Sequence, residues 1–199
     1  MAIGAAVSFL VSLAVVAAEI PIEVRGDAPD SLWPAPVKCG VPFPVGAYMP
    51  GDPVVLVDDA GAPQIAQTAV TATWDPKGEQ GVRWLLLDFL AERGKSYRLL
   101  FGANATPPVP ASEPVARENA AAILIDTGKL KAQCSKQKFD IFSSLQRPNR
   151  SGAFTPMMRP DAWAGYYIEH ETRGVFRADL DPKPEIALEE NGPVRATIR

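Results

Sequence analysis

The 199-residue chain carries a net charge of −3 and has a sequence pI near 5.3, so it lacks the excess of Lys and Arg that nucleic-acid binding requires. Its hydrophobic content of 47% is sufficient for a buried core. The 20 prolines fall between strand-like runs and favour strands and turns over helices, because proline removes a backbone donor and fixes φ.

The N-terminal stretch 2–18 is uncharged and apolar, and Glu19 follows it. Its length suits a secretory signal peptide or a short membrane span. Small residues precede Glu19 and no basic stop-transfer cluster follows, which favours a signal peptide over residues 1–18, although its first part carries no Lys or Arg. We therefore expect a secreted or periplasmic protein without membrane contact after cleavage.

Residues 19–105 alternate short apolar runs with Gly, Pro and Asp clusters, the pattern of a small antiparallel barrel or sandwich. Strands are predicted at 20–24, 54–57, 64–74, 82–90 and 96–101. An extended segment at 39–48 is expected to turn Phe43 to the core and to leave Pro42 and Pro44 on an edge. Residues 82–90 are apolar on both faces except at Arg83 and Asp88, so this strand is predicted to be central.

A Pro-rich segment at 106–119 is predicted to be a semi-rigid linker and a domain boundary. In the second half, 120–199, hairpins are expected at 122–134, 165–178 and 185–199. A strand is predicted at 139–145 and a polar loop at 146–160. Strand alternation still runs at Arg199, so we expect the N-terminal part of a longer protein.

The order of motifs between residues 39 and 90 is specific: Gly-Val-Pro-Phe-Pro at 40–44, Asp-Asp-Ala-Gly at 58–61, Gln67 followed by Trp74, and Val-Arg-Trp-Leu-Leu-Leu-Asp-Phe at 82–89. This order resembles the N-terminal cradle-loop (RIFT-type) barrel of an exported family. That family includes the exo-acting rhamnogalacturonan lyases of polysaccharide lyase family 26 and their YetA-like relatives. The match covers residues 22–105 and, more weakly, 120–199.

The resemblance implies an all-β fold: a small cradle-loop (RIFT-type) β-barrel at 19–105, followed by an incomplete antiparallel β-sandwich at 120–199. One departure is visible, because the family's tight Trp-Pro-Asp-Gly-Ser turn is replaced by the longer segment 74–81.

In function, the resemblance implies a non-catalytic N-terminal accessory region of an exported polysaccharide-degrading protein. Its partners would be a C-terminal catalytic domain of the same protein and a pectic polysaccharide or oligosaccharide. The family's catalytic machinery is attributed to a helical domain outside this chain, so no catalytic residue is assigned.

Two other hypotheses rest on the residues. A free-standing glycan-binding β-module would stack sugar rings on Trp163, Tyr166 and Tyr167, although packing between the two β-domains would also explain these aromatics. A lyase would use Tyr166 and His170, which share one strand face, but a hairpin with a histidine near its turn explains them more simply.

Metal and cofactor chemistry has little support. One histidine and two distant cysteines cannot form a zinc site, and Asp58 and Asp59 are expected to shape a turn rather than bind calcium. No cofactor is expected. Cys39 and Cys134 are predicted to be small buried thiols, with a disulfide between them as the alternative. Trp74 and Trp84 are expected in the core.

Overall fold

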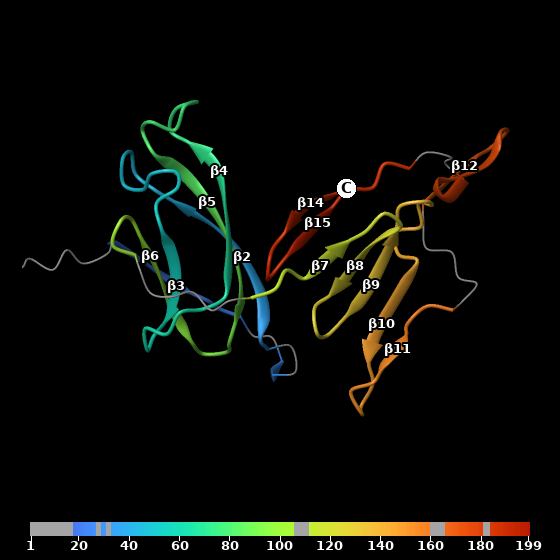
Figure 1. Cartoon of the computed structure of the whole chain (residues 1–199), viewed down its shortest axis with the longest axis horizontal. Coiled ribbons are helices and arrows are strands. Elements are labelled where there is room, and N and C mark those ends of the chain that lie inside the picture. Colours follow the sequence, from blue (N-terminus) through green and yellow to red (C-terminus); the bar gives the residue numbers. More distant parts are fainter. Residues whose placement is uncertain (1–17, 27–28, 31–32, 106–111, 160–165, 181–183) are drawn as a thin grey trace, which may run out of the picture.

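The chain is built from antiparallel β-strands joined by turns, as the computed structural model shows (Figure 1). The structure describes residues 18–26, 29–30, 33–105, 112–159, 166–180 and 184–199. Residues 1–17 of the signal peptide expected at 1–18, and residues 106–111 of the expected linker, lie outside these residues, and Ala18 is the first residue of a strand. The described part contains no α-helix, which confirms the all-β class.

Six strands of the first half form two three-stranded sheets, with the orders β1-β6-β3 and β2-β5-β4. The six strands are β1 (Ala18–Glu23), β2 (Ala35–Pro42), β3 (Val54–Asp58), β4 (Ala66–Thr73), β5 (Val82–Ala91) and β6 (Ser96–Phe101). All their pairings are antiparallel.

A single apolar core lies between these two sheets. Leu87, Phe89 and Leu99 are fully buried, and the Phe89 ring meets Tyr97 edge-on at a centroid distance of 5.0 Å. Each large apolar side chain that leaves water contributes about 1.5–3 kcal/mol. Because residues from both sheets share this core, the six strands fold as one unit.

Strand β5 is the centre of its sheet, as predicted, and pairs with β2 on one side and β4 on the other. The expectations for the preceding segment are also confirmed. Phe43 is buried, whereas Pro42, the last residue of the edge strand β2, and Pro44, just beyond it, are exposed. Proline is tolerated there because its missing N–H leaves no ladder bond unmade.

The predicted barrel takes the form of two facing sheets. Strand β6 pairs with β1 and β3, and no ladder among the described residues joins these strands to β2, β5 or β4. The sheets therefore do not close into a hydrogen-bonded barrel, although they enclose a common core.

The long turn at 74–81 is held by Asp75. Its carboxylate accepts hydrogen bonds from the backbone N–H groups of Lys77, Glu79 and Gln80 at 3.0, 3.3 and 2.6 Å. Gly81 has φ of 91°, and a Cβ there would lie 2.7 Å from the Tyr48 carbonyl oxygen. Glycine is required at this position because an L side chain would clash with backbone.

The second half contains a five-stranded antiparallel sheet of order β11-β10-β9-β8-β7. Its strands are β7 (Ala116–Glu118), β8 (Ala122–Asp126), β9 (Lys131–Ser135), β10 (Ser144–Pro148) and β11 (Phe154–Pro156). Two hairpins follow, β12 (Tyr167–His170) with β13 (Gly174–Arg177) and β14 (Leu188–Asn191) with β15 (Ala196–Ile198). A 3-10 turn covers Ala178–Leu180.

The β14–β15 hairpin packs on one face of the five-stranded sheet, where Leu188 and Ile198 join the cluster around Ile123 and Cys134. A sheet faced by a second, smaller β-layer is the arrangement expected of a partial sandwich. We call the face under β14–β15 the inner face and the opposite one the outward face.

One predicted strand is misplaced. Residues 139–143 lie outside any strand. Strand β10 begins at Ser144, near the end of the expected strand, and continues to Pro148, inside the expected loop. The reason is that Phe139 and Phe142 turn toward an apolar cavity on the inner face, so the chain leaves the ladder there. Pairing with β9 resumes at Ser144, opposite Gln133.

Candidate functional site

The outward face of the five-stranded sheet carries two rows of mainly polar side chains. The first row crosses four strands in register, and consists of Arg117, Leu124, Gln133 and Ser144. The second row crosses three strands, and consists of Asp126, Lys131 and Gln146. Period-two alternation puts both rows on the same face, because positions two apart along a strand point the same way.

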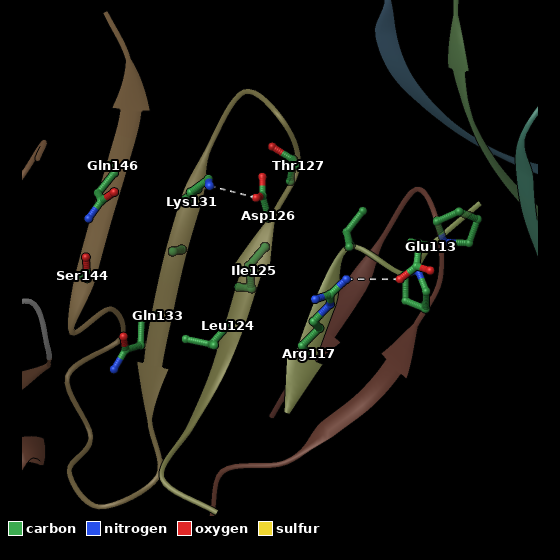
Figure 2. Close-up of a pocket in the computed structure, with 14 residues that line it drawn as sticks. Glu113, Arg117, Leu124, Ile125, Asp126, Thr127, Lys131, Gln133, Ser144 and Gln146 are labelled. Atoms are coloured by element: carbon green, nitrogen blue, oxygen red, sulfur yellow. Dashed lines mark hydrogen bonds and ion pairs between the residues drawn. The ribbon is translucent and has the colours of Figure 1, made fainter. Parts of the chain in front are cut away.

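These rows form the floor of a groove of about 660 Å³ (Figure 2). One wall comes from the segment that precedes β7, at Glu113, Pro114 and Val115, and from Pro193 in the turn between β14 and β15. Leu124 and the two prolines give the groove apolar patches among its polar groups. We call this hollow the outward groove.

Charges in the outward groove are balanced. The Arg117 guanidinium lies 3.2 Å from the Glu113 carboxylate, and Lys131 Nζ lies 3.2 Å from Asp126 Oδ2. The Gly128 N–H and Lys131 hold the pKa of Asp126 below its usual value. Asp126 is therefore a carboxylate at neutral pH and accepts hydrogen bonds.

The chemistry of the outward groove is hydrogen bonding rather than acid–base catalysis. Planar amide, guanidinium and carboxylate groups from Gln133, Gln146, Arg117 and Asp126 can form paired hydrogen bonds with adjacent hydroxyl groups. The described residues contain no group of three or more His, Cys, Asp or Glu side chains that could hold a metal ion. Asp58 stabilises its own turn, because its Oδ1 accepts a hydrogen bond from the Ala62 backbone N–H at 2.8 Å.

Two of the three aromatics predicted to bind sugar lie away from this groove. Tyr166 is 66% exposed, stacks on Phe139 at a centroid distance of 6.2 Å, and borders the inner-face cavity. Tyr167, the first residue of β12, is 59% exposed. Trp163 lies outside the described residues. The outward groove and Tyr166 are thus on opposite faces of the sheet.

His170 ends β12 and organises the turn of its hairpin. Its Nδ1 accepts hydrogen bonds from the backbone N–H groups of Thr172 and Arg173, both at 3.2 Å. An Nδ1 occupied in this way is a poor base for proton abstraction. This geometry supports the simpler explanation given by the sequence, a histidine near a hairpin turn.

Trp74 and Trp84 are not core residues, contrary to expectation. They are 38% and 40% exposed. The inward positions of β5 belong to Leu85 and Leu87, so alternation turns Trp84 outward, where its ring lies over Gly40. The Trp74 indole donates to the Phe43 carbonyl oxygen at 3.0 Å. Apolar neighbours in the sequence misled the prediction, because both faces of β5 are apolar.

Cys39 and Cys134 are free thiols, as expected, but only Cys134 is buried, whereas Cys39 is half-buried. Burial, and to a lesser degree the Asp88 carboxylate, raises the pKa of Cys39. Burial, and then Asp140, raises the pKa of Cys134. Neither cysteine has the cationic neighbourhood that activates a nucleophilic thiol.

Sequence reasoning missed the residues of the outward groove. A signal was present, since Lys131 and Gln133 alternate with the buried Ala132 and Cys134 along β9. That pattern predicts a polar face of the sheet, but it does not predict that the face forms a groove. The hollow depends on the wall residues, which are distant from β9 in the sequence.

Comparisons with known proteins add no assignment. No family model matches the chain, and no curated protein matches it. Among the described residues, no helix is sufficiently long and apolar to cross a membrane.

Proposed function

We propose that this chain is a non-catalytic, carbohydrate-binding accessory region of an exported polysaccharide-degrading protein similar to the exo-rhamnogalacturonan lyases. It binds a pectic polysaccharide or oligosaccharide outside the cell or in the periplasm, and a separate catalytic domain performs the cleavage. The observation that carries this proposal is the outward groove of about 660 Å³, with planar hydrogen-bonding side chains from β7, β8, β9 and β10.

The composition of the groove supports a sugar ligand. Sugars present hydroxyl groups around an otherwise apolar ring, and the groove places Gln133 directly opposite the apolar Leu124, with Pro114 in its wall. These polar side chains stand on paired strands of one sheet, which fixes their spacing before a ligand arrives. The order of motifs between residues 39 and 90 supports the accessory role.

Calorimetric titration with rhamnogalacturonan oligosaccharides tests the proposal. Each removed hydrogen bond is worth about 0.5–1.5 kcal/mol, so Gln133→Ala together with Gln146→Ala should weaken binding roughly tenfold. Gln137→Ala, an exposed glutamine beyond the groove, is the matched control and should leave affinity unchanged.

The aromatic alternative makes the opposite prediction. If Tyr166→Ala or Tyr167→Ala abolished binding and the double glutamine variant did not, the hairpin would be the site. Cleavage of rhamnogalacturonan by the isolated chain, detected as new unsaturated ends, would contradict the non-catalytic assignment.

A further inference from the structure

The hairpin of β10 and β11 carries positive charges and no negative ones. Residues 141–159, which include both strands and the turn between them, contain three arginines and neither Asp nor Glu, although the whole chain has a net charge of −3. The arginines are Arg147, Arg150 and Arg159. Because no carboxylate within the segment offsets this charge, the hairpin attracts anions.

Two of these arginines line a hollow of about 450 Å³ at the hairpin, together with Pro148, Asn149 and Thr155. Arg147 on β10 lies directly opposite Thr155 on β11, so both side chains stand on the same face of the hairpin. Arg150 follows in the turn. Both arginines and Thr155 are exposed, which leaves their polar ends within reach of a solute. We call this hollow the hairpin hollow.

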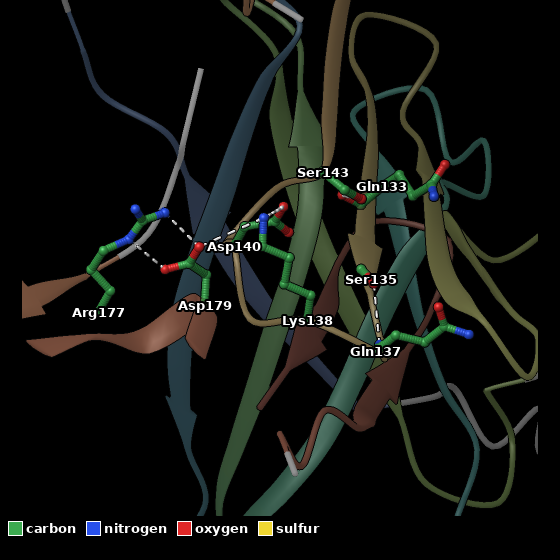
Figure 3. Close-up of polar contacts among 8 residues, drawn as sticks. All are labelled: Gln133, Ser135, Gln137, Lys138, Asp140, Ser143, Arg177 and Asp179. Carbon is green, nitrogen blue, oxygen red and sulfur yellow. Dashed lines mark hydrogen bonds and ion pairs between the residues drawn. The ribbon is translucent and has the colours of Figure 1, made fainter. Parts of the chain in front are cut away.

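The two guanidinium groups of the hairpin hollow are not neutralised by the protein. Among the described residues, no ion pair includes Arg147 or Arg150. Other cations of the same β-region are matched with carboxylates: Lys138 Nζ lies 3.9 Å from Asp140 and 3.7 Å from Asp179 (Figure 3). Each guanidinium has five N–H donors and no acceptor, so the hairpin hollow offers donors to a ligand.

The turn that carries Arg150 is held by hydrogen bonds within the hairpin. Asn149 Oδ1 accepts from the backbone N–H groups of Ser151 and Ala153 at 2.9 and 3.1 Å, and from the Ser151 hydroxyl at 2.7 Å. The Gly152 N–H donates to the Asn149 carbonyl oxygen at 3.0 Å. Because Oδ1 is engaged in the turn, the part of the Asn149 side chain left for a ligand is its NH₂ group, a donor. A rigid hollow rich in donors suits an anion.

We propose that the hairpin hollow binds the carboxylates of an acidic polysaccharide, carried by its uronic acid units, through Arg147 and Arg150. The planar fork of a guanidinium matches the two oxygens of a carboxylate, which gives paired hydrogen bonds as well as charge attraction. The unpaired arginines set the sign of the ligand, while its being a glycan rests on the proposed function. This site is separate from the outward groove, since Arg147 follows the groove residue Gln146 and points to the other face of the sheet.

Calorimetric titration with hexagalacturonate at low salt tests the proposal, with folding of each variant verified by circular dichroism. Arg147→Gln together with Arg150→Gln removes both charges, and we expect binding to weaken roughly tenfold. Arg173→Gln removes another exposed arginine that has no ion pair in the described part of the chain, and as the matched control it should change Kd less than twofold. The uncharged methyl ester of hexagalacturonate should not distinguish wild type from the double Gln variant.

Two further measurements separate paired hydrogen bonding from simple charge attraction and a carboxylate from other anions. Arg147→Lys together with Arg150→Lys keeps the charges and removes the planar forks, so it should bind hexagalacturonate at least about threefold more weakly than wild type. Inorganic phosphate should displace hexagalacturonate no better than sodium chloride does at the same ionic strength.

The outward groove is tested apart from this site. In a Gln133→Ala, Gln146→Ala background, the two Arg→Gln substitutions should still weaken hexagalacturonate binding roughly tenfold, so a groove that binds no glycan leaves this test intact. Equal affinity of wild type and the double Gln variant, or wild-type affinity in the double Lys variant, would overturn the proposal. Selective displacement by phosphate would assign the hairpin hollow to a phosphate ligand and overturn it as well.

Discussion

Arg195, in the turn between β14 and β15, donates a hydrogen bond from Nε to the Oδ2 atom of Asp88 on β5, at 3.2 Å. The Asp88 side chain is 6% exposed and belongs to the first half of the chain. The Arg195 backbone N–H also donates to Gln67 Oε1 at 3.0 Å. These contacts join the two β-regions through one turn.

Replacing Arg195 should therefore loosen this junction. Arg195→Ala leaves a buried carboxylate without its donor, and we expect a loss of about 1–3 kcal/mol in the free energy of unfolding, measured by urea denaturation. Arg199→Ala is the matched control, since Arg199 is 62% exposed and pairs with Glu189 at the surface. It should change stability by less than about 1 kcal/mol. Equal effects would show that Arg195 contributes no more than a surface ion pair.

Two leucines on β5 test the position of the core. Leu87 is fully buried, whereas Leu90 is 50% exposed. Leu87→Ala should destabilise the protein by about 2–5 kcal/mol, because it removes packed methyl groups and leaves a cavity. Leu90→Ala should cost less than about 1 kcal/mol in the same urea titration. A larger loss of unfolding free energy in Leu90→Ala than in Leu87→Ala would mean that the core lies on the opposite face of β5.

Acid should weaken the turn that Asp75 holds. Hydrogen bonds from the backbone N–H of Gln80, and then of Lys77 and Glu79, hold the pKa of Asp75 below its usual value. A lowered carboxyl pKa contributes stability above the unfolded-state pKa, and this contribution is lost as pH falls through the folded-state pKa. Asp75→Ala should thus lower Tm at pH 7, and the difference from wild type should shrink below about pH 3.9.

The control for this turn is Asp59→Ala, which removes an exposed aspartate from another turn and should give a small Tm shift at both pH values. A gap between wild type and Asp75→Ala that stayed constant down to pH 2 would mean that the carboxylate charge is unimportant there.

Thiol counting tests the state of the cysteines. In denaturant, two equivalents of thiol reagent should react per chain without prior reduction, because Cys39 and Cys134 are free. In the folded protein at pH 7, both should react slowly, since burial raises both pKa values and lowers the thiolate fraction. No reactive thiol in denaturant would indicate a disulfide instead.

Much of the fold could be predicted from the sequence, because strand alternation and turn residues are local signals. The central position of β5, the buried Phe43 and the hairpin turn at 127–128 followed from such patterns. The direction of Trp84 did not, since a strand that is apolar on both faces gives no indication of which side meets the core. The position of β10 was also missed, because Phe139 and Phe142 fit a strand as well as a loop that packs against a cavity.

The outward groove could not be predicted, because it depends on tertiary contacts. Pro193 reaches its wall only because the β14–β15 turn returns beside β7, where Gly192 accepts a hydrogen bond from Val115 N at 2.9 Å. The residues of the floor are ordinary polar positions on half-buried strands. Their grouping into one site is visible only when the five strands are assembled.

Two-dimensional ¹H–¹⁵N NMR during titration with rhamnogalacturonan oligosaccharides would test the proposal that the outward groove binds a glycan. Binding should shift the side-chain amide signals of Gln133 and Gln146 and the backbone signals of Arg117 and Leu124, while the signals of the β12–β13 hairpin remain in place. Unchanged groove signals at millimolar oligosaccharide, or shifts confined to that hairpin, would contradict the claim.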